Sequence, residues 1–99
     1  MDTQSLKELI LQGESQTVEF KENLDNEALE TVGAFANSKG GILLIGVSDK
    51  KEVKGLQLGK DTLKDWANRV SQSTEPRVIP EIETSEIEGK TVVIIRIKE

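Results

Sequence analysis

The chain is organised around residues 34–49, which read AFANSKGGILLIGVSD. This pattern predicts the end of a helix, a glycine turn, one buried strand and a polar exit. Gly40 and Gly41 provide the turn, because a residue without Cβ adopts positive φ at no steric cost. Residues 42–47 carry no polar side chain, so we expect both faces of this strand to be buried. A rigid strand with polar groups at both ends is equally a scaffold for a site and an ordinary core strand with solvated ends.

Hydrophobic periodicity predicts three amphipathic helices around this strand, over residues 3–13, 25–36 and 62–70. The expected N-terminal caps, each a side chain able to accept from a helical N–H, are Thr3 or Ser5, Asp25 or Asn26, and Asp61 or Thr62. Gly33, inside the second helix, indicates close packing against a neighbouring backbone. In the third helix, Trp66 lies on the apolar stripe with Val70, which favours a place in the core over a base-stacking role.

Four further strands are expected at residues 17–21, 53–56, 79–87 and 91–97. Pro80 indicates that the strand it belongs to is an edge strand or starts there. Two hairpins, with loops at residues 48–52 and 88–90, imply antiparallel pairing. The order of elements predicts one α+β domain over residues 1–99: a mixed, largely antiparallel sheet with about three helices packed on it. Because the sequence stops directly after a core strand, we expect the N-terminal part of a longer protein.

Composition excludes several kinds of chemistry. The chain has no Cys and no His, which removes disulfides, thiolate zinc sites, the Ser-His triad and the usual general base. A net charge of −5 argues against a broad basic footprint of the kind that dominates nucleic-acid affinity, although a local basic patch is compatible with it. No apolar run approaches the ~20 residues that span a membrane. The first residues lack the features of a signal peptide, so we expect a cytoplasmic protein.

Three acidic residues near the predicted strands are the first candidate site: Glu14, Glu19 and Asp49. Mg²⁺ and Mn²⁺ prefer two or three carboxylate oxygens and keep waters for chemistry. Such a cluster activates a water against a phosphodiester, and Lys21 would neutralise the developing charge. The other interpretation is a solvated acidic face. Spacing alone favours the solvated face, because 18 acidic residues in 99 guarantee some cluster.

The segment 37–41 is the second candidate. Exposed N–H groups of a glycine turn, together with Lys39, can hold a phosphate. The segment follows a helix C-terminus, however, whose dipole disfavours anions. A simple helix stop made by Gly40 is therefore the favoured interpretation.

The third candidate is a local basic strip around the first hairpin, made of Lys39, Lys50, Lys51 and Lys54, which would contact a nucleic-acid backbone. Charged hairpin tips are also ordinary solubility features. Arg96 is the one charge in the last apolar strand, and both an interface and the sheet edge are open as its place.

Three blocks of the sequence resemble the Schlafen AlbA-2 domain, a DNA-binding module also described as a divergent AAA-4 domain. They are GESQTVEFKE at residues 13–22, AFANSKGGILLIGVSD at residues 34–49 and VKG at residues 53–55. The blocks occur in the order that the family has. The combination of E-x-x-x-x-E-F-K with A-F-A-N-x-x-G-G-x-L-x-I-G-V is specific, whereas either block alone is much less so.

The resemblance implies an α+β fold that serves nucleic-acid binding, usually N-terminal to further domains in a prokaryotic transcriptional regulator. In nuclease-active Schlafens, three acids of these blocks form a metal-dependent RNA-cleaving site, and by motif they fall on Glu14, Glu19 and Asp49. The family commonly has a second acid directly before the last of these, where this chain has Ser48. Schlafen cores also pair two such modules, from which we hypothesise a homodimer.

We therefore expect a nucleic-acid-binding module of a transcriptional regulator, with DNA or RNA as partner and no cofactor needed for binding. Its expected contacts are Lys21, Asn37, Lys39, Lys50 and Lys51. One alternative is an Mg²⁺- or Mn²⁺-dependent nuclease that uses Glu14, Glu19 and Asp49 with Lys21. The other is a dimerisation or protein-interaction domain without a role in nucleic-acid binding.

Overall fold

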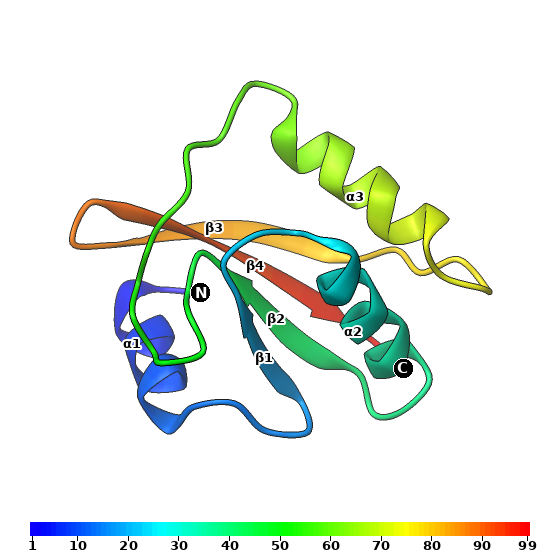
Figure 1. Cartoon of the computed structure of the whole chain (residues 1–99), viewed down its shortest axis with the longest axis horizontal. Coiled ribbons are helices and arrows are strands. Elements are labelled where there is room, and N and C mark those ends of the chain that lie inside the picture. The colour runs from blue at the N-terminus through cyan, green and yellow to red at the C-terminus, as the bar shows by residue number, and fades with distance from the viewer.

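The computed structural model describes all residues, 1–99, as three helices and one four-stranded sheet (Figure 1). In chain order the elements are α1 (Thr3–Gln12), β1 (Val18–Lys21), α2 (Asn26–Ala36), β2 (Gly41–Ile45), α3 (Thr62–Gln72), β3 (Glu81–Ile87) and β4 (Lys90–Ile97). The strand order across the sheet is β1-β2-β4-β3. β1 and β2 run parallel, whereas β2 pairs with β4, and β4 with β3, in antiparallel register. The predicted α+β domain with a mixed, largely antiparallel sheet is confirmed.

The two central strands are buried on both faces, as the apolar runs predict. Leu43, Leu44 and Ile45 of β2 are fully buried, and so are residues 92–95 of β4. The alternating side chains of these strands feed two separate clusters. One cluster lies under α1, and the other lies under α2 and α3, so that helices cover both faces of the sheet (Figure 1).

The ends of α1 and α2 follow ordinary capping chemistry, with one correction. The cap of α1 is Asp2, not Thr3 or Ser5: its carboxylate accepts from the N–H of Ser5 at 2.7 Å. An ionised carboxylate at this position also stabilises the positive end of the helix dipole. The cap of α2 is Asp25, as predicted, and it accepts from the N–H of Ala28 at 2.8 Å.

The apolar side chains of α3 are less buried than the hydrophobic pattern predicts. Val70 is its one fully buried side chain, while Leu63 and Trp66 are half-buried against the cluster under α2. Asp61 occupies the cap position, but its side chain accepts no hydrogen bond from the helix. Thr62 instead accepts from the N–H of Gly59 at 2.8 Å, which closes the turn that leads into the helix.

The predicted strand at residues 53–56 is wrong. The loop after β2 does turn back, but only Val47 and Val53 pair, as an isolated antiparallel bridge. β2 already has β1 on one side and β4 on the other, so no edge is free for a further strand. Gly46 then accepts from the N–H groups of Lys54 and Gly55, and the chain leaves the sheet towards α3.

Two glycines behave differently from one another. A Cβ on Gly41 would lie 2.7 Å from the ring of Phe35, so glycine here lets β2 start directly beneath the end of α2. Gly33 was expected to mark a close backbone approach, and that expectation is wrong. No atom lies within 4 Å of the place a Cβ would take at Gly33.

Carboxylate pair and candidate nucleic-acid interface

Glu14 and Glu19 lie together at the free edge of β1. The Glu14 carboxylate accepts from the N–H of Phe20 at 3.0 Å, and the N–H of Ser15 donates to Val18 O at 2.9 Å. Residues 14 and 15 therefore occupy backbone groups of β1 that face away from β2, which protects this edge from pairing with another chain. The structure brings together two of the three acids that the motifs single out.

The surroundings of Glu19 raise the pKa of its carboxyl group above the ordinary value. Burial raises the pKa of Glu19, and a side-chain hydrogen bond with Glu14 and the negative charge of Glu14 raise it further. The nearby charge of Lys21 acts in the opposite direction. The environment of Glu19 therefore favours the protonated form of its carboxyl group.

Asp49 lies apart from this pair. It is exposed and borders a depression at the carboxyl ends of β1 and β2, together with Lys21, Asp25 and Glu27. Neither Glu14 nor Glu19 borders that depression. No group of three or more acidic side chains in the chain is arranged to hold a metal ion. As placed here, the three acids do not fit a shared Mg²⁺ or Mn²⁺, and the three-carboxylate metal site stays a prediction.

Lys21 already has a partner within the chain. Its Nζ lies 2.6 Å from a Glu27 oxygen, and its side chain is 16% exposed. The hydrogen bond to Glu27 raises the pKa of Lys21, as do the charges of Glu19 and Asp25, although burial opposes them. This lysine links β1 to the first turn of α2, and a phosphate would have to compete with Glu27 for it.

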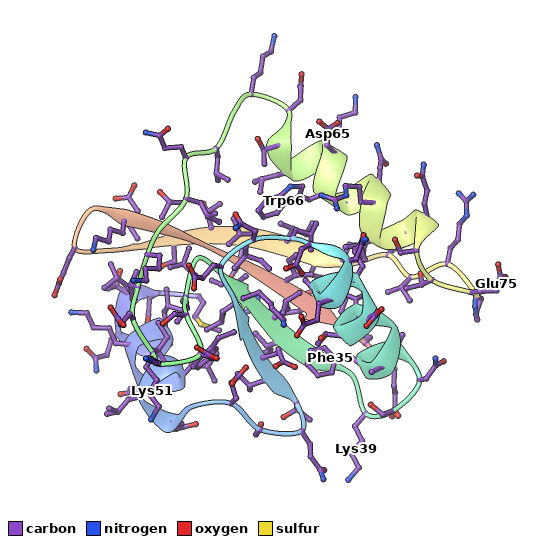
Figure 2. All side chains as sticks on the ribbon, in the orientation of Figure 1. Phe35, Lys39, Lys51, Asp65, Trp66 and Glu75 are labelled. Atoms are coloured by element: carbon purple, nitrogen blue, oxygen red, sulfur yellow. The ribbon has the colours of Figure 1, made fainter.

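The other predicted contacts fall at the two opposite ends of β2. Asn37 and Lys39 precede the strand, and both are exposed, with the Lys39 side chain pointing away from the ribbon (Figure 2). Lys39 makes no ion pair. Lys50 and Lys51 follow the strand. Lys50 is exposed, whereas Lys51 has φ of 69° and donates to Leu11 O at 2.9 Å, next to the end of α1. These residues therefore do not form one continuous strip.

The glycine turn itself is a helix stop, in line with the favoured interpretation. Gly40 has φ of +78°, and its N–H donates to Phe35 O at 2.8 Å. The N–H groups of Asn37 and Ser38 also donate to carbonyl oxygens of α2. Because these amides are engaged in ending the helix, they are not free to cradle a phosphate.

Two cations near Lys39 were not among the predicted contacts. An open depression of about 290 Å³ lies where β2 begins and β4 ends, and Lys39, Arg96 and Lys98 all border it. We call it the basic depression. Arg96 pairs with Ile42 of β2 and with Glu81 of β3 in the sheet register, which puts it on the same face as both. The sequence signal was present in the single charge of the last strand, but it showed neither the register nor the neighbours.

Comparison with known proteins adds a family and a fold. The family model described as "Schlafen, AlbA_2" matches residues 14–99. The solution structure of the N-terminal domain of a RecG-related protein of Nitrosomonas europaea, named for an ATP-dependent DNA helicase, is similar with a TM-score of 0.68 and 21% identity. That match covers 100% of this chain and 74% of the other.

A second similar structure is the crystal structure of the DIP2311 protein of Corynebacterium diphtheriae, with a TM-score of 0.51 and 19% identity. It covers 92% of this chain but only 21% of that protein, so this chain spans about a fifth of it. Both likenesses establish the fold. No helix of this chain combines the length and the apolar character needed to cross a bilayer.

Proposed function

Because this chain belongs to the Schlafen AlbA_2 family, we propose that it is a nucleic-acid-binding module, acting within a cytoplasmic transcriptional regulator that carries further domains. The family match over residues 14–99 is the observation that carries the proposal. The N-terminal position of the similar RecG-related domain supports the idea of further domains.

The charges indicate how such a module would bind. Lys39 and Lys50 are exposed and make no ion pair, so they are available to phosphates at no internal cost. Lys21 and Lys51 would contribute only after giving up Glu27 and the Leu11 carbonyl. With a net charge of −5 we expect modest affinity that falls steeply with salt, because each phosphate contact releases counterions.

The test is fluorescence polarisation with labelled single- and double-stranded DNA and RNA at two salt concentrations. Binding at about 50 mM salt that weakens at 200 mM is the expected result. The absence of binding to all four probes at low salt would refute the proposal.

A divalent-metal-dependent nuclease is the second candidate, favoured by the adjacency of Glu14 and Glu19. Asp49 would have to move to complete a three-carboxylate site, so we rank this function below binding. A homodimer would bring two sets of lysines to one nucleic acid, which is how an acidic chain would raise its affinity. Sedimentation with and without nucleic acid tests that arrangement.

A further inference from the structure

One end of the sheet face that carries α1 is left without a helix. α1 lies towards the β3–β4 hairpin, where Thr3 donates to Glu86 O at 3.0 Å. The other end of that face lies near the glycine turn and the C-terminus, at the opposite end of the strands from the hairpin (Figure 1). The basic depression occupies this uncovered end, with Val18 and Ile42 among its lining side chains.

The charges around the basic depression oppose the charge of the whole chain. Three cations border it, Lys39, Arg96 and Lys98, against one carboxylate, Glu81. The chain itself has a net charge of −5. The depression is therefore a local positive site in an acidic molecule, and it would attract the anionic part of a ligand.

The acidic partners of these cations hold them weakly. Lys98 lies 3.3 Å from Glu81, with the two side chains 84% and 56% exposed. Arg96 lies 3.1 Å from Glu83, which also contacts the N-terminal ammonium of Met1. The exposed Lys98–Glu81 pair contributes little to stability, so a phosphate can replace Glu81 at low cost. Arg96 and Glu83 are only 33% and 35% exposed, and Glu83 keeps its contact with the N-terminus if Arg96 turns to a phosphate. Lys39 makes no ion pair and points away from the ribbon (Figure 2).

The residues that line the depression favour contact with the phosphate backbone of a nucleic acid over contact with its bases. Gly40 and Gly41 line the depression with backbone alone, because the side-chain direction of each points into the protein, towards the Ile97 carbonyl and the Phe35 ring. No aromatic side chain borders it, and Phe20 and Phe35 are both buried. Recognition of bases by stacking needs exposed aromatic rings, whereas Lys and Arg bind phosphates whatever the base sequence.

Building on the proposed function, we propose that Lys39, Arg96 and Lys98 form the site where this module contacts the phosphate backbone of a nucleic acid, without reading its sequence. Arg96 provides a planar fork for phosphate oxygens, and the two lysines provide flexible charges on either side of it. This surface is distinct from the carboxylate pair at the edge of β1.

The test compares two triple variants that lose the same charge. The site variant carries Lys39→Gln, Arg96→Gln and Lys98→Gln, and the control carries Lys7→Gln, Lys60→Gln and Lys64→Gln, three exposed lysines outside the depression. With a single-stranded oligonucleotide as probe, the slope of log K against log salt should fall by about 2 in the site variant, at about 0.7 for each lost contact. The control should keep the wild-type slope, and probes of different sequence should respond alike.

Folding is controlled separately, because Arg96 also pairs with Glu83. Arg96→Lys keeps the charge, so it should keep the salt slope and lose only the part of the affinity that depends on the planar fork. If the triple site variant fails to fold, the double variant Lys39→Gln/Lys98→Gln carries the test, since both side chains are exposed. An unchanged slope in a folded site variant, or an equal loss in the control, overturns this site while leaving the binding function intact. A wild-type chain that binds no probe overturns both.

Discussion

Gly40 lies so close to the end of β4 that a Cβ on it would overlap the carbonyl oxygen of Ile97. Its φ of +78° also lies in the left-handed region, and its N–H ends α2 by donating to Phe35 O. Gly40 thus ends α2, directly precedes β2 and borders the basic depression. The turn is fixed by backbone contacts, which do not move aside for a side chain.

Replacing Gly40 with Ala should therefore destabilise the fold more than left-handed strain alone. Gly89 is the matched control, because its φ is +77° and no atom lies within 4 Å of an added Cβ. We expect Gly89→Ala to cost about 1–2 kcal/mol, the usual cost of left-handed geometry. Gly40→Ala should cost about 3 kcal/mol or more, because the Ile97 carbonyl must also shift. Urea unfolding measures both, and equal losses would contradict the proposed overlap.

Replacing Gly33 with Ala should stabilise the protein. Gly33 lies inside α2, its φ is outside the left-handed region, and an added Cβ meets nothing within 4 Å. The change lowers the entropy of the unfolded chain and favours the helix, for a gain of about 0.5–1 kcal/mol. A higher urea midpoint at unchanged m-value is the expected observation. A lower midpoint would contradict the free space found around the position of the added Cβ.

Replacing Glu19 with Gln should stabilise the protein in a pH-dependent way. The pKa of Glu19 is raised above its ordinary value of 4.5 in the folded chain, so the native state binds this proton more tightly than the unfolded state. Stability from this group is therefore present at low pH and is lost as the pH rises through the folded pKa. Gln cannot ionise, and its amide can still donate to Glu14. At pH 7 the free energy of unfolding should be larger for the variant than for the wild type, and this difference should shrink at pH 4. A difference that is the same at both pH values would contradict the raised pKa of Glu19.

Local signals predicted most of the elements. Asp25, Pro80 and Gly40 each mark a boundary through their own backbone or side-chain chemistry, and the structure keeps all three boundaries. The predictions that were wrong depend on parts of the chain far from the residues concerned. Val53 pairs at a single position because β1 and β4 already flank β2, and no pattern within residues 48–56 contains that fact.

The same distinction applies to the candidate sites. Glu14 and Glu19 are close in sequence, so one turn before β1 brings them together. Lys39, Arg96 and Lys98 meet only because β4 pairs with β2 from its first residue, Gly41 opposite Ile97. That register depends on the whole sheet, which is why Arg96 stood as an isolated charge in the sequence.

The response to Mn²⁺ distinguishes nucleic-acid binding from metal-dependent nuclease activity. Glu14 already accepts from the Phe20 N–H, burial and the charge of Glu14 favour the protonated form of Glu19, and Asp49 borders a different depression. We therefore expect millimolar Mn²⁺ to leave the unfolding midpoint unchanged, because an ion that binds the native state would raise it, and we expect labelled RNA to stay intact. Cleavage that needs Mn²⁺, is lost in Glu19→Gln and in Asp49→Asn, and survives in the control Glu22→Gln would establish the nuclease and require Asp49 to move towards the pair.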